Sequence, residues 1–450
     1  MAKNKFIGGA ICIAMGTVIV KLIGAIYRIP LVNLIGAKGL GLYQMIFPVY
    51  ALLIDFSGAS MPSALSKIIS SVGDGERKAY AKSYLKVSLR YLKKVGLVGS
   101  LLLVITAYPV SLLQGNTDAF LGYLTLAPSV FLVSIISCYR GYFQGLMIMK
   151  HTAVSQIIES LFKLAFGLVI AYLLMPNVKL AVAGATFSVT LSELVALIYL
   201  LIKYKRQTKN DITVEIKTDK DMIKSLIKTA LPITLTGVMI PFSHFLESFI
   251  VLNALPFTQE VSTALYGVLS GVVHTVLSLP VGLTYGVAVA SIPTVSSLKT
   301  LEEKRRGISD GVLLTAGLGV IFSIFVYIFA PQIVNILFSR FSVEQIAISV
   351  RLLRLTSPTV LLLSLVQTTN AQLVATDKFY LPLFSLGTGI AVKIILSLIL
   401  IPSPKINIYG GGISLIACYF VAVMINFIIL IKKGTQDASK TISGRKIRAI

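Results

Sequence analysis

The sequence predicts an all-α polytopic membrane protein with about twelve transmembrane helices. Of its 450 residues, 56% are hydrophobic and only 13% are charged, and the mean hydropathy is +0.86. A soluble core could not hide this much apolar surface, so we expect the surrounding solvent to be lipid. Apolar segments close to the roughly 20 residues that a helix needs to cross a bilayer recur along the whole chain.

Twelve such segments define the expected membrane-spanning helices. We refer to them below as spans 1 to 12. In chain order they cover residues 7–30, 42–65, 95–113, 119–141, 152–175, 180–202, 226–252, 262–290, 309–332, 353–375, 379–401 and 409–431.

The distribution of positive charge predicts how these spans are oriented. If the N-terminus is cytoplasmic, 31 of the 41 Lys and Arg residues fall on the inner side and six on the outer side. Such an excess in inner loops is the usual signature of orientation in a cell membrane. It also accounts for most of the net charge of +23. The predicted partners are therefore anionic membrane lipids and not nucleic acid, and both termini are expected to be cytoplasmic.

The chain contains an internal repeat. "APSVFLVSII" at 127–136 aligns without gaps with "SPTVLLLSLV" at 357–366, and "ASMPSALS" at 59–66 aligns with "ASIPTVSS" at 290–297. Each match joins spans that are six apart, which predicts a parallel repeat of two six-helix lobes. In chain order, we expect an N-terminal lobe, a polar cytoplasmic linker, a C-terminal lobe and a basic cytoplasmic tail. Their bounds are 1–202, 203–224, 225–431 and 432–450.

Eight charged residues lie inside the spans when Arg140, Lys228, Asp310 and Arg354, at the span ends, are counted with the adjoining loops. A charge at the centre of a bilayer costs at least ~2.5–3.5 kcal/mol on insertion scales, so each of them needs a partner or a purpose. Four are cations and four are acids: Lys21, Arg28, Lys163, Lys393, Asp55, Glu159, Glu193 and Glu247.

Lys21 and Arg28 are the strongest candidates for binding an anion. They are seven residues apart on span 1, which places them near one helix face with a rise of roughly 10.5 Å between them. Arginine offers a planar fork for phosphate oxygens and lysine a point charge, so this face suits a diphosphate. In the alternative, Arg28 extends to the outer interface near Pro30, and Lys21 pairs with an acid.

The other charged residues of the first lobe are expected to form polar contacts or to anchor a helix end, and each has an alternative role. Glu159 and Lys163 have the i,i+4 spacing of an internal ion pair, with cavity lining or coupling as the alternative. Arg140 ends span 4 as an inner-surface anchor or as a contact for an entering pyrophosphate. Asp55 and Glu193 suit interhelical polar pairs, with ion coupling as the alternative.

The second lobe carries a histidine and glutamate cluster. "SHFLES" places His244 and Glu247 on one helix face, and His274 follows on the next helix. The cluster fits a proton- or sodium-sensitive element or a polar packing network. We expect no metal site, because the cluster lacks a zinc-binding motif and the three cysteines lie singly.

Three stretches resemble the polysaccharide-transport branch of the multidrug/oligosaccharidyl-lipid/polysaccharide (MOP) exporter superfamily. They are "YRGYFQGLMIMKHTAVSQIIESLFKLAFGL" at 139–168, "ALPITLTGVMIP" at 230–241 and "YGVLSGVVHTVLSLPVGLTYGVAVASIPTVSS" at 266–297. The chain is most similar to the stage V sporulation protein B group and its kin, the MurJ-like lipid II flippases, and the resemblance covers essentially all twelve spans.

This resemblance implies a MATE-like fold of two six-helix bundles around a central cavity that opens alternately to either side. It also implies transport of an undecaprenyl-diphosphate-linked cell-wall or polysaccharide precursor to the outer leaflet. Arg28, Lys21, Arg140 and His274 are the residues we expect in that cavity. MurJ-type members carry an arginine just before the span-8 proline, where this chain has His274, and two further C-terminal helices, where it has the basic tail.

Three classes of function therefore remain at the level of sequence. The first is a flippase for a lipid-linked saccharide, acting as a monomer in the plasma membrane. The others are a cation-coupled multidrug exporter and a membrane scaffold for envelope or spore-cortex synthesis. The chain shows no P-loop or nucleophile elbow, so we expect a transporter without cofactors and not an enzyme. Its energy would come from Na⁺, H⁺ or the membrane potential.

Overall fold

The computed structural model describes residues 2–447 except 74, 210–219, 298–299 and 377–379. Side chains are further excluded from the description at 2–14, 17, 220, 232, 236, 289–297, 301 and 431–447. The described residues form helices and no strand, which confirms the predicted all-α class. The chain divides into two compact units, Met1–Phe245 (unit 1) and Leu246–Ile450 (unit 2).

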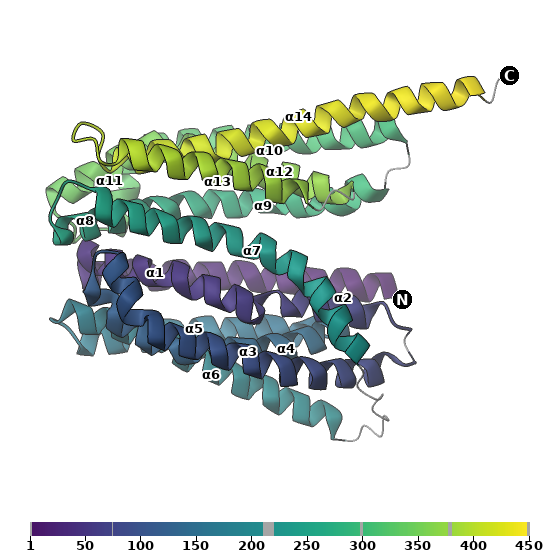
Figure 1. The fold of residues 1–450 in the computed structure, drawn as a ribbon, viewed down its shortest axis with the longest axis horizontal. Coiled ribbons are helices and arrows are strands. Elements are labelled where there is room, and N and C mark those ends of the chain that lie inside the picture. The colour runs from purple at the N-terminus through teal and green to yellow at the C-terminus, as the bar shows by residue number, and fades with distance from the viewer. Residues whose placement is uncertain (1, 74, 210–219, 298–299, 377–379, 448–450) are drawn as a thin grey trace. The chain divides into compact units, whose positions relative to one another are not determined.

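Unit 1 contains helices α1 to α6 and the N-terminal part of α7. In Figure 1 the elements α3 to α6 lie alongside α1. In chain order the elements are α1 (Ala2–Ile54), the π-helical turn η1 (Asp55–Ala59), α2 (Met61–Ser70), α3 (Arg77–Leu113), the 3₁₀ turn η2 (Thr117–Ala119), α4 (Phe120–Gly145), α5 (Met149–Leu173), α6 (Val178–Thr208) and α7 (Lys220–Ala254).

Unit 2 contains the C-terminal end of α7 and all the later helices (Figure 1). They are α8 (Gln259–Tyr266), the π-helical stretch η3 (Gly267–Val273), α9 (His274–Ser297), α10 (Leu301–Leu337), α11 (Val343–Thr356), α12 (Pro358–Ala375), α13 (Leu381–Leu400) and α14 (Tyr409–Ile447).

Helix starts follow local capping chemistry. Asn177 accepts a hydrogen bond from the backbone of Leu180 and so caps α6. Thr300 and Ser342 open α10 and α11 with reciprocal capping boxes. Each side-chain oxygen satisfies a backbone N–H that the first helical turn leaves without an intrahelical acceptor.

Ten described helices are long and apolar enough to cross a membrane, or eleven if the bent pair α11 and α12 counts as one span. The first of these candidates runs from Val18 to Ser70 and holds parts of two expected spans. Its 53 residues would measure about 80 Å as one straight helix, against a hydrocarbon core of about 30 Å. Gly36, with φ of 69°, breaks it, because a left-handed backbone is easiest for glycine.

The exposed surface of the helices is apolar, as lipid contact requires. The most apolar stretch of α10 buries only 17% of its residues, whereas that of α4 buries 56%. Ile105 on α3 and Leu313 on α10 are more than 70% exposed. Such side chains on outer helices need a hydrocarbon solvent, so the protein is a multi-pass membrane protein.

The internal repeat is visible in the packing of each unit. In unit 1, α4 is the central helix and packs against α2, α3 and α6. In unit 2, α12 packs against α9, α10 and α14. Helices α2, α3, α4 and α6 contain all or part of spans 2, 3, 4 and 6, and α9, α10, α12 and α14 contain all or part of spans 8, 9, 10 and 12. Span 4 therefore contacts spans 2, 3 and 6, and span 10 contacts spans 8, 9 and 12. The same neighbours six spans apart confirm the parallel repeat.

The expected linker differs in part from the structure. Its first residues continue α6 to Thr208, and its last residues begin α7 at Lys220. Residues 210–219 lie outside the described part of the chain. The boundary between the compact units falls inside α7, after Phe245. The expected basic tail begins as a continuation of α14, which runs to Ile447.

Candidate functional site

The two cations of span 1 lie in different environments. Lys21 is exposed, whereas Arg28 is half-buried and lies about two turns before Gly36, where α1 is broken. The Nε and Nη2 atoms of Arg28 are buried, and neither has a hydrogen-bond partner among the described residues. A buried guanidinium nitrogen without an acceptor carries a large desolvation cost. An anion would supply the missing acceptors, and the anion binding expected of Arg28 stays a prediction.

Aromatic side chains surround this arginine. Tyr27 and Tyr43 interact electrostatically with Arg28, and both tyrosines are buried. The Nζ of Lys163, on α5, lies 5.7 Å from the ring centroid of Tyr27 and 5.1 Å from that of Phe47. Cation–π contacts of this kind hold an ammonium group without neutralising it. The fold thus gathers Arg28 and Lys163 around one group of aromatic rings in unit 1.

The expected ion pair between Glu159 and Lys163 is wrong. Glu159 Oε2 instead accepts a hydrogen bond of 2.7 Å from Arg140 Nη2, and Lys163 lies over the two rings. The i,i+4 spacing permitted a local pair, but a guanidinium on the neighbouring helix α4 offers a stronger, directional partner. Arg140 Nε also donates to Ser155 Oγ at 3.0 Å. Arg140 therefore takes part in a fixed polar network that joins α4 to α5.

Glu193 forms the interhelical polar contact that the sequence predicted. It is 2% exposed and lies on α6, where Tyr50 OH donates to its Oε1 at 2.7 Å. Ser129 Oγ is in hydrogen-bond contact with Oε2, and the two hydroxyl oxygens are 2.6 Å apart. Sequence reasoning missed Tyr50 and Ser129, because a hydroxyl in an apolar span gives no signal of its partner.

Asp55 differs from Glu193. It opens the π-helical turn η1 and is half-buried. Within the described residues it makes no ion pair or hydrogen bond, and its carboxylate lies near Gly237 of α7. A Cβ built on Gly237 would lie 3.5 Å from Asp55 Oδ2. The polar pair expected for Asp55 is therefore not seen in this part of the chain, and its coupling role stays a prediction.

Unit 2 contains a buried ion pair that sequence reasoning did not assign. Lys393 Nζ, on α13, lies 3.2 Å from Glu247 Oε2, on α7, and the side chains are 3% and 1% exposed. Lys393 is in this way the partner of one of the four acids inside the spans. Two lone opposite charges in spans 7 and 11 were the available signal, but the sequence could not show that those helices meet.

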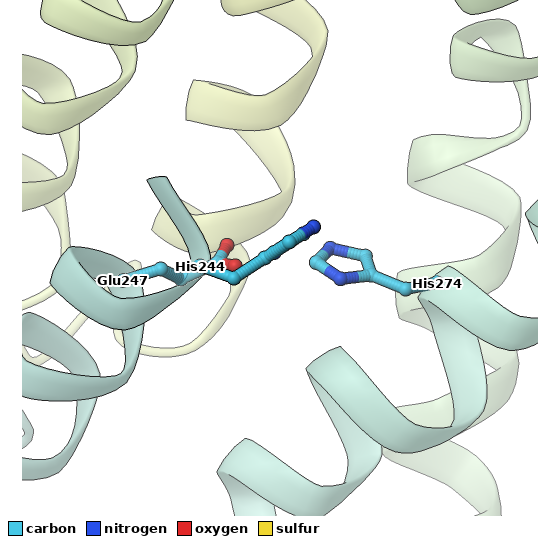
Figure 2. Close-up of side chains that lie close together, drawn as sticks. All are labelled: His244, Glu247 and His274. Atoms are coloured by element: carbon cyan, nitrogen blue, oxygen red, sulfur yellow. The ribbon is translucent and has the colours of Figure 1, made fainter. Parts of the chain in front are cut away.

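His244 and His274 lie beside this pair. Figure 2 shows the two imidazole rings directed toward each other, with the carboxylate of Glu247 next to His244. Ligand atoms of the three residues all lie within 4.8 Å of one another. Two imidazoles and one carboxylate form a donor set that zinc accepts in proteins. Here the ammonium of Lys393 already contacts the carboxylate, so the expectation of no metal stays a prediction, and a polar network describes the contacts.

The structure thus places the predicted site residues in three local groups. In unit 1, Arg28 and Lys163 share aromatic neighbours, and Arg140 pairs with Glu159. In unit 2, His274 and Glu247 belong to one cluster. The convergence of Arg28, Lys21, Arg140 and His274 on one central cavity stays a prediction.

Comparison with known proteins assigns the chain to a family. Residues 6–299 match the family model described as "Polysaccharide biosynthesis protein". The stage V sporulation protein B of Bacillus subtilis is 26% identical over 432 residues, covering 92% of this chain and 82% of that protein. The lipid II flippase MurJ of Bacillus subtilis is 24% identical over 476 residues, covering 99% and 86%.

Solved structures share the fold. An inward-facing conformation of a multidrug-resistance MATE-family transporter of the MOP superfamily superposes with a TM-score of 0.75 at 16% identity, covering 93% of this chain and 95% of that one. An outward-facing conformation of such a transporter gives 0.64 with coverages of 95% and 96%. The chain therefore belongs to the polysaccharide biosynthesis protein family, in the polysaccharide-transport branch of the MOP exporter superfamily.

Proposed function

We propose that the protein is a flippase that moves an undecaprenyl-diphosphate-linked saccharide from the inner to the outer leaflet of the plasma membrane by alternating access. The observation that carries the proposal is the pair of buried Arg28 nitrogens that have no hydrogen-bond partner in the described part of the chain. A diphosphate supplies the acceptors that these donors lack, and the planar guanidinium matches two phosphate oxygens at once.

Lys163 strengthens the case for an anionic substrate. Its ammonium shares Tyr27 with the Arg28 region and has no acidic partner among the described residues, since Glu159 is held by Arg140. Two cations without acids beside them favour a ligand with more than one negative charge. The relatives named above, a lipid II flippase among them, agree with a lipid-linked substrate of this kind.

The alternative of a multidrug exporter for cationic compounds is less well supported by the same contacts. Such a transporter needs an acid that is available to a cation. In unit 2, Glu247 is paired with Lys393 at 3.2 Å, and in unit 1, Glu159 is paired with Arg140 at 2.7 Å. Asp55 and Glu193 are the span acids without an ion pair among the described residues, but Glu193 is held by two hydroxyls. In the same part of the chain, Arg28 and Lys163 lie together without an acid, so the arrangement favours an anion.

The membrane potential can supply energy for this transport. With the termini in the cytoplasm, as the charge distribution predicts, the diphosphate moves outward from a negative interior. Each negative charge that crosses 100 mV in this direction gains ~2.3 kcal/mol. The sign of the potential therefore favours export, and we expect flipping to accelerate when the inside-negative potential is raised.

The experiment is leaflet exchange in proteoliposomes that carry a labelled lipid-diphosphosaccharide. We expect the wild-type protein to accelerate exchange over protein-free vesicles and Arg28→Ala to lower the rate. Loss of a charge-assisted hydrogen bond of about 1.5–3 kcal/mol corresponds to a decrease of roughly ten- to hundredfold.

The matched control is Arg306→Ala. Arg306 pairs with Glu302 on the exposed face of α10, where both side chains are more than 75% exposed, so we expect its removal to leave exchange unchanged. Equal exchange with and without wild-type protein would refute the flippase function. Equal loss in both variants would assign the effect of Arg28 to net charge and not to a binding site.

A further inference from the structure

Glu193 lies in a compact group of oxygens that joins three helices of unit 1. Tyr50 belongs to α1, Ser129 to α4 and Glu193 to α6. All three are buried, with exposed fractions of 5%, 0% and 2%. The group contains three oxygen–oxygen contacts: Tyr50 to Oε1 at 2.7 Å, Ser129 to Oε2, and Tyr50 to Ser129 at 2.6 Å.

Counting hydrogens shows what these contacts require. Each contact needs one hydrogen between its two oxygens, and each hydroxyl has only one to donate. If the carboxylate is ionised, both hydroxyls donate to it, and the oxygens of Tyr50 and Ser129 then lie 2.6 Å apart with no hydrogen between them. Two oxygens at that distance without a hydrogen repel each other.

A proton on Glu193 completes the group. The carboxyl O–H then donates to Ser129, Ser129 donates to Tyr50, and Tyr50 donates to the carbonyl oxygen of Glu193. Three hydrogens serve three contacts in a closed ring, and each bond polarises the next. No oxygen in the ring is left without a partner.

The charged groups around Glu193 do not stabilise its ionised form. The groups that act on it are Tyr50 from α1, Arg140 from α4 and Glu159 from α5. Arg140 is bound to Glu159, and Glu193 makes no ion pair among the described residues. An ionised carboxylate that is 2% exposed would lie buried beside a second acid without a cation of its own, which is costly.

We propose that Glu193 is a proton-binding site that carries its proton at neutral pH, and that this proton links α1, α4 and α6 through Tyr50 and Ser129. Release of the proton leaves an anion that both hydroxyls must approach as donors, so the contact between Tyr50 and Ser129 has to open. The proton thus controls how three helices pack.

The hydrogen-bonded group of Tyr50, Ser129 and Glu193 is also connected to the region of Lys163 in unit 1. The ring of Tyr50 packs edge-on against that of Phe47 with centroids 6.0 Å apart, and Phe47 lies under Lys163 at 5.1 Å. If Tyr50 shifts when the proton is released, it displaces Phe47, and Phe47 carries the change to the cation–π contact with Lys163. Proton binding and anion binding would then influence each other, as linked sites must.

Infrared difference spectroscopy of the reconstituted protein tests the proton without any substrate. We expect the wild-type protein at neutral pH to show the C=O band of a protonated carboxyl, shifted in D₂O and lost in Glu193→Gln. Asp55→Asn and Glu159→Gln are the matched controls and should keep the band. Absence of the band, or its loss only in a control variant, would overturn the proposal.

Stability provides a second measurement. In Glu193→Gln the amide N–H can donate to Ser129 while its carbonyl accepts from Tyr50, so we expect this variant to fold and Glu193→Ala to be less stable. At neutral pH the folded wild-type protein holds a proton on Glu193, whereas the exposed glutamate of the unfolded chain is ionised. Unfolding therefore releases a proton, and the melting temperature should fall as the pH rises. Glu193→Gln should lack this part of the pH dependence, and an identical pH dependence in both proteins would contradict the proposal. Because neither measurement involves transport, the flippase function and the proton site can fail independently.

Discussion

Three residues inside the spans are stabilised in different ways, and a fourth is not. Lys393 is paired with an acid, Lys163 lies over aromatic rings, Glu193 is held by hydroxyls, and two nitrogens of Arg28 have no described acceptor. The first three arrangements lower the cost of a polar or charged group inside the membrane, whereas that of Arg28 leaves part of the cost in place. Arg28, the least satisfied of them, is therefore the residue that we propose binds the ligand.

The buried pair of unit 2 yields a prediction for stability. Lys393→Met leaves Glu247 without its ammonium, and Glu247→Gln leaves Lys393 without its carboxylate, in a site where both are at most 3% exposed. We expect each single change to destabilise the protein by about 3–5 kcal/mol. Denaturation in detergent micelles measures the loss.

The double variant is the control for this pair. Lys393→Met together with Glu247→Gln removes both charges, so it should be more stable than either single variant. Single variants as stable as the wild type would show that the pair does not form.

The partners of Glu159 can be identified by double-mutant cycles. Glu159 contacts Arg140, and Lys163 contacts aromatic rings instead. We expect a coupling energy of about 0.5–3 kcal/mol between Glu159→Gln and Arg140→Gln. The cycle of Glu159→Gln with Lys163→Gln should give a coupling close to zero. A larger value for the second cycle than for the first would contradict the assigned contacts.

At the scale of elements, the repeat places equivalent residues in different roles. The offset of 230 residues that aligns Pro128 with Pro358 also aligns Lys163 with Lys393. Both lysines lie on the fifth helix of their repeat, yet in the described part of the chain only Lys393 has an acidic partner. Helix packing was duplicated, whereas the electrostatic environment diverged, so the two units are expected to differ in what they bind.

Close helix packing in unit 2 depends on one glycine of α13. A Cβ on Gly389 would lie 2.4 Å from the backbone oxygen of Cys418 on α14, and a backbone atom cannot move aside as a flexible side chain can. We expect Gly389→Ala to lower stability by about 1–3 kcal/mol. Thermal unfolding in detergent measures the effect.

Gly317 on α10 is the matched control, because a Cβ there would meet nothing within 4 Å. Gly317→Ala should be neutral or stabilise the helix by up to about 1 kcal/mol. If both alanine variants behave alike, the contact between α13 and α14 is looser than the structure indicates.

At the scale of the whole molecule, the charge distribution predicts the orientation in the membrane. Starting from a variant in which Cys12, Cys138 and Cys418 are replaced, single cysteines can be placed at Lys78→Cys and Lys405→Cys. We expect an impermeant thiol reagent added to intact cells to label position 405 and not position 78, since inner loops retain Lys and Arg. Labelling of position 78 alone would reverse the proposed orientation.

The sequence by itself determined the class, the spans and the repeat. Composition and apolar segment length are properties of consecutive residues, and all twelve expected spans overlap described helices. The two aligned pairs of segments correctly placed spans 2 and 4 over spans 8 and 10. The position of Glu193 in a polar contact between helices could also be predicted, because a buried acid in lipid needs a partner.

Only the tertiary structure decided which side chains meet. Spacing along one helix suggested Glu159 with Lys163, but Arg140 from a neighbouring helix takes that carboxylate. Lys393 reaches Glu247 across 146 residues of sequence, and Tyr50 reaches Glu193 across 143. A membrane helix shows its charges in the sequence, whereas their partners depend on which helix faces pack together, and packing joins residues that the chain keeps far apart.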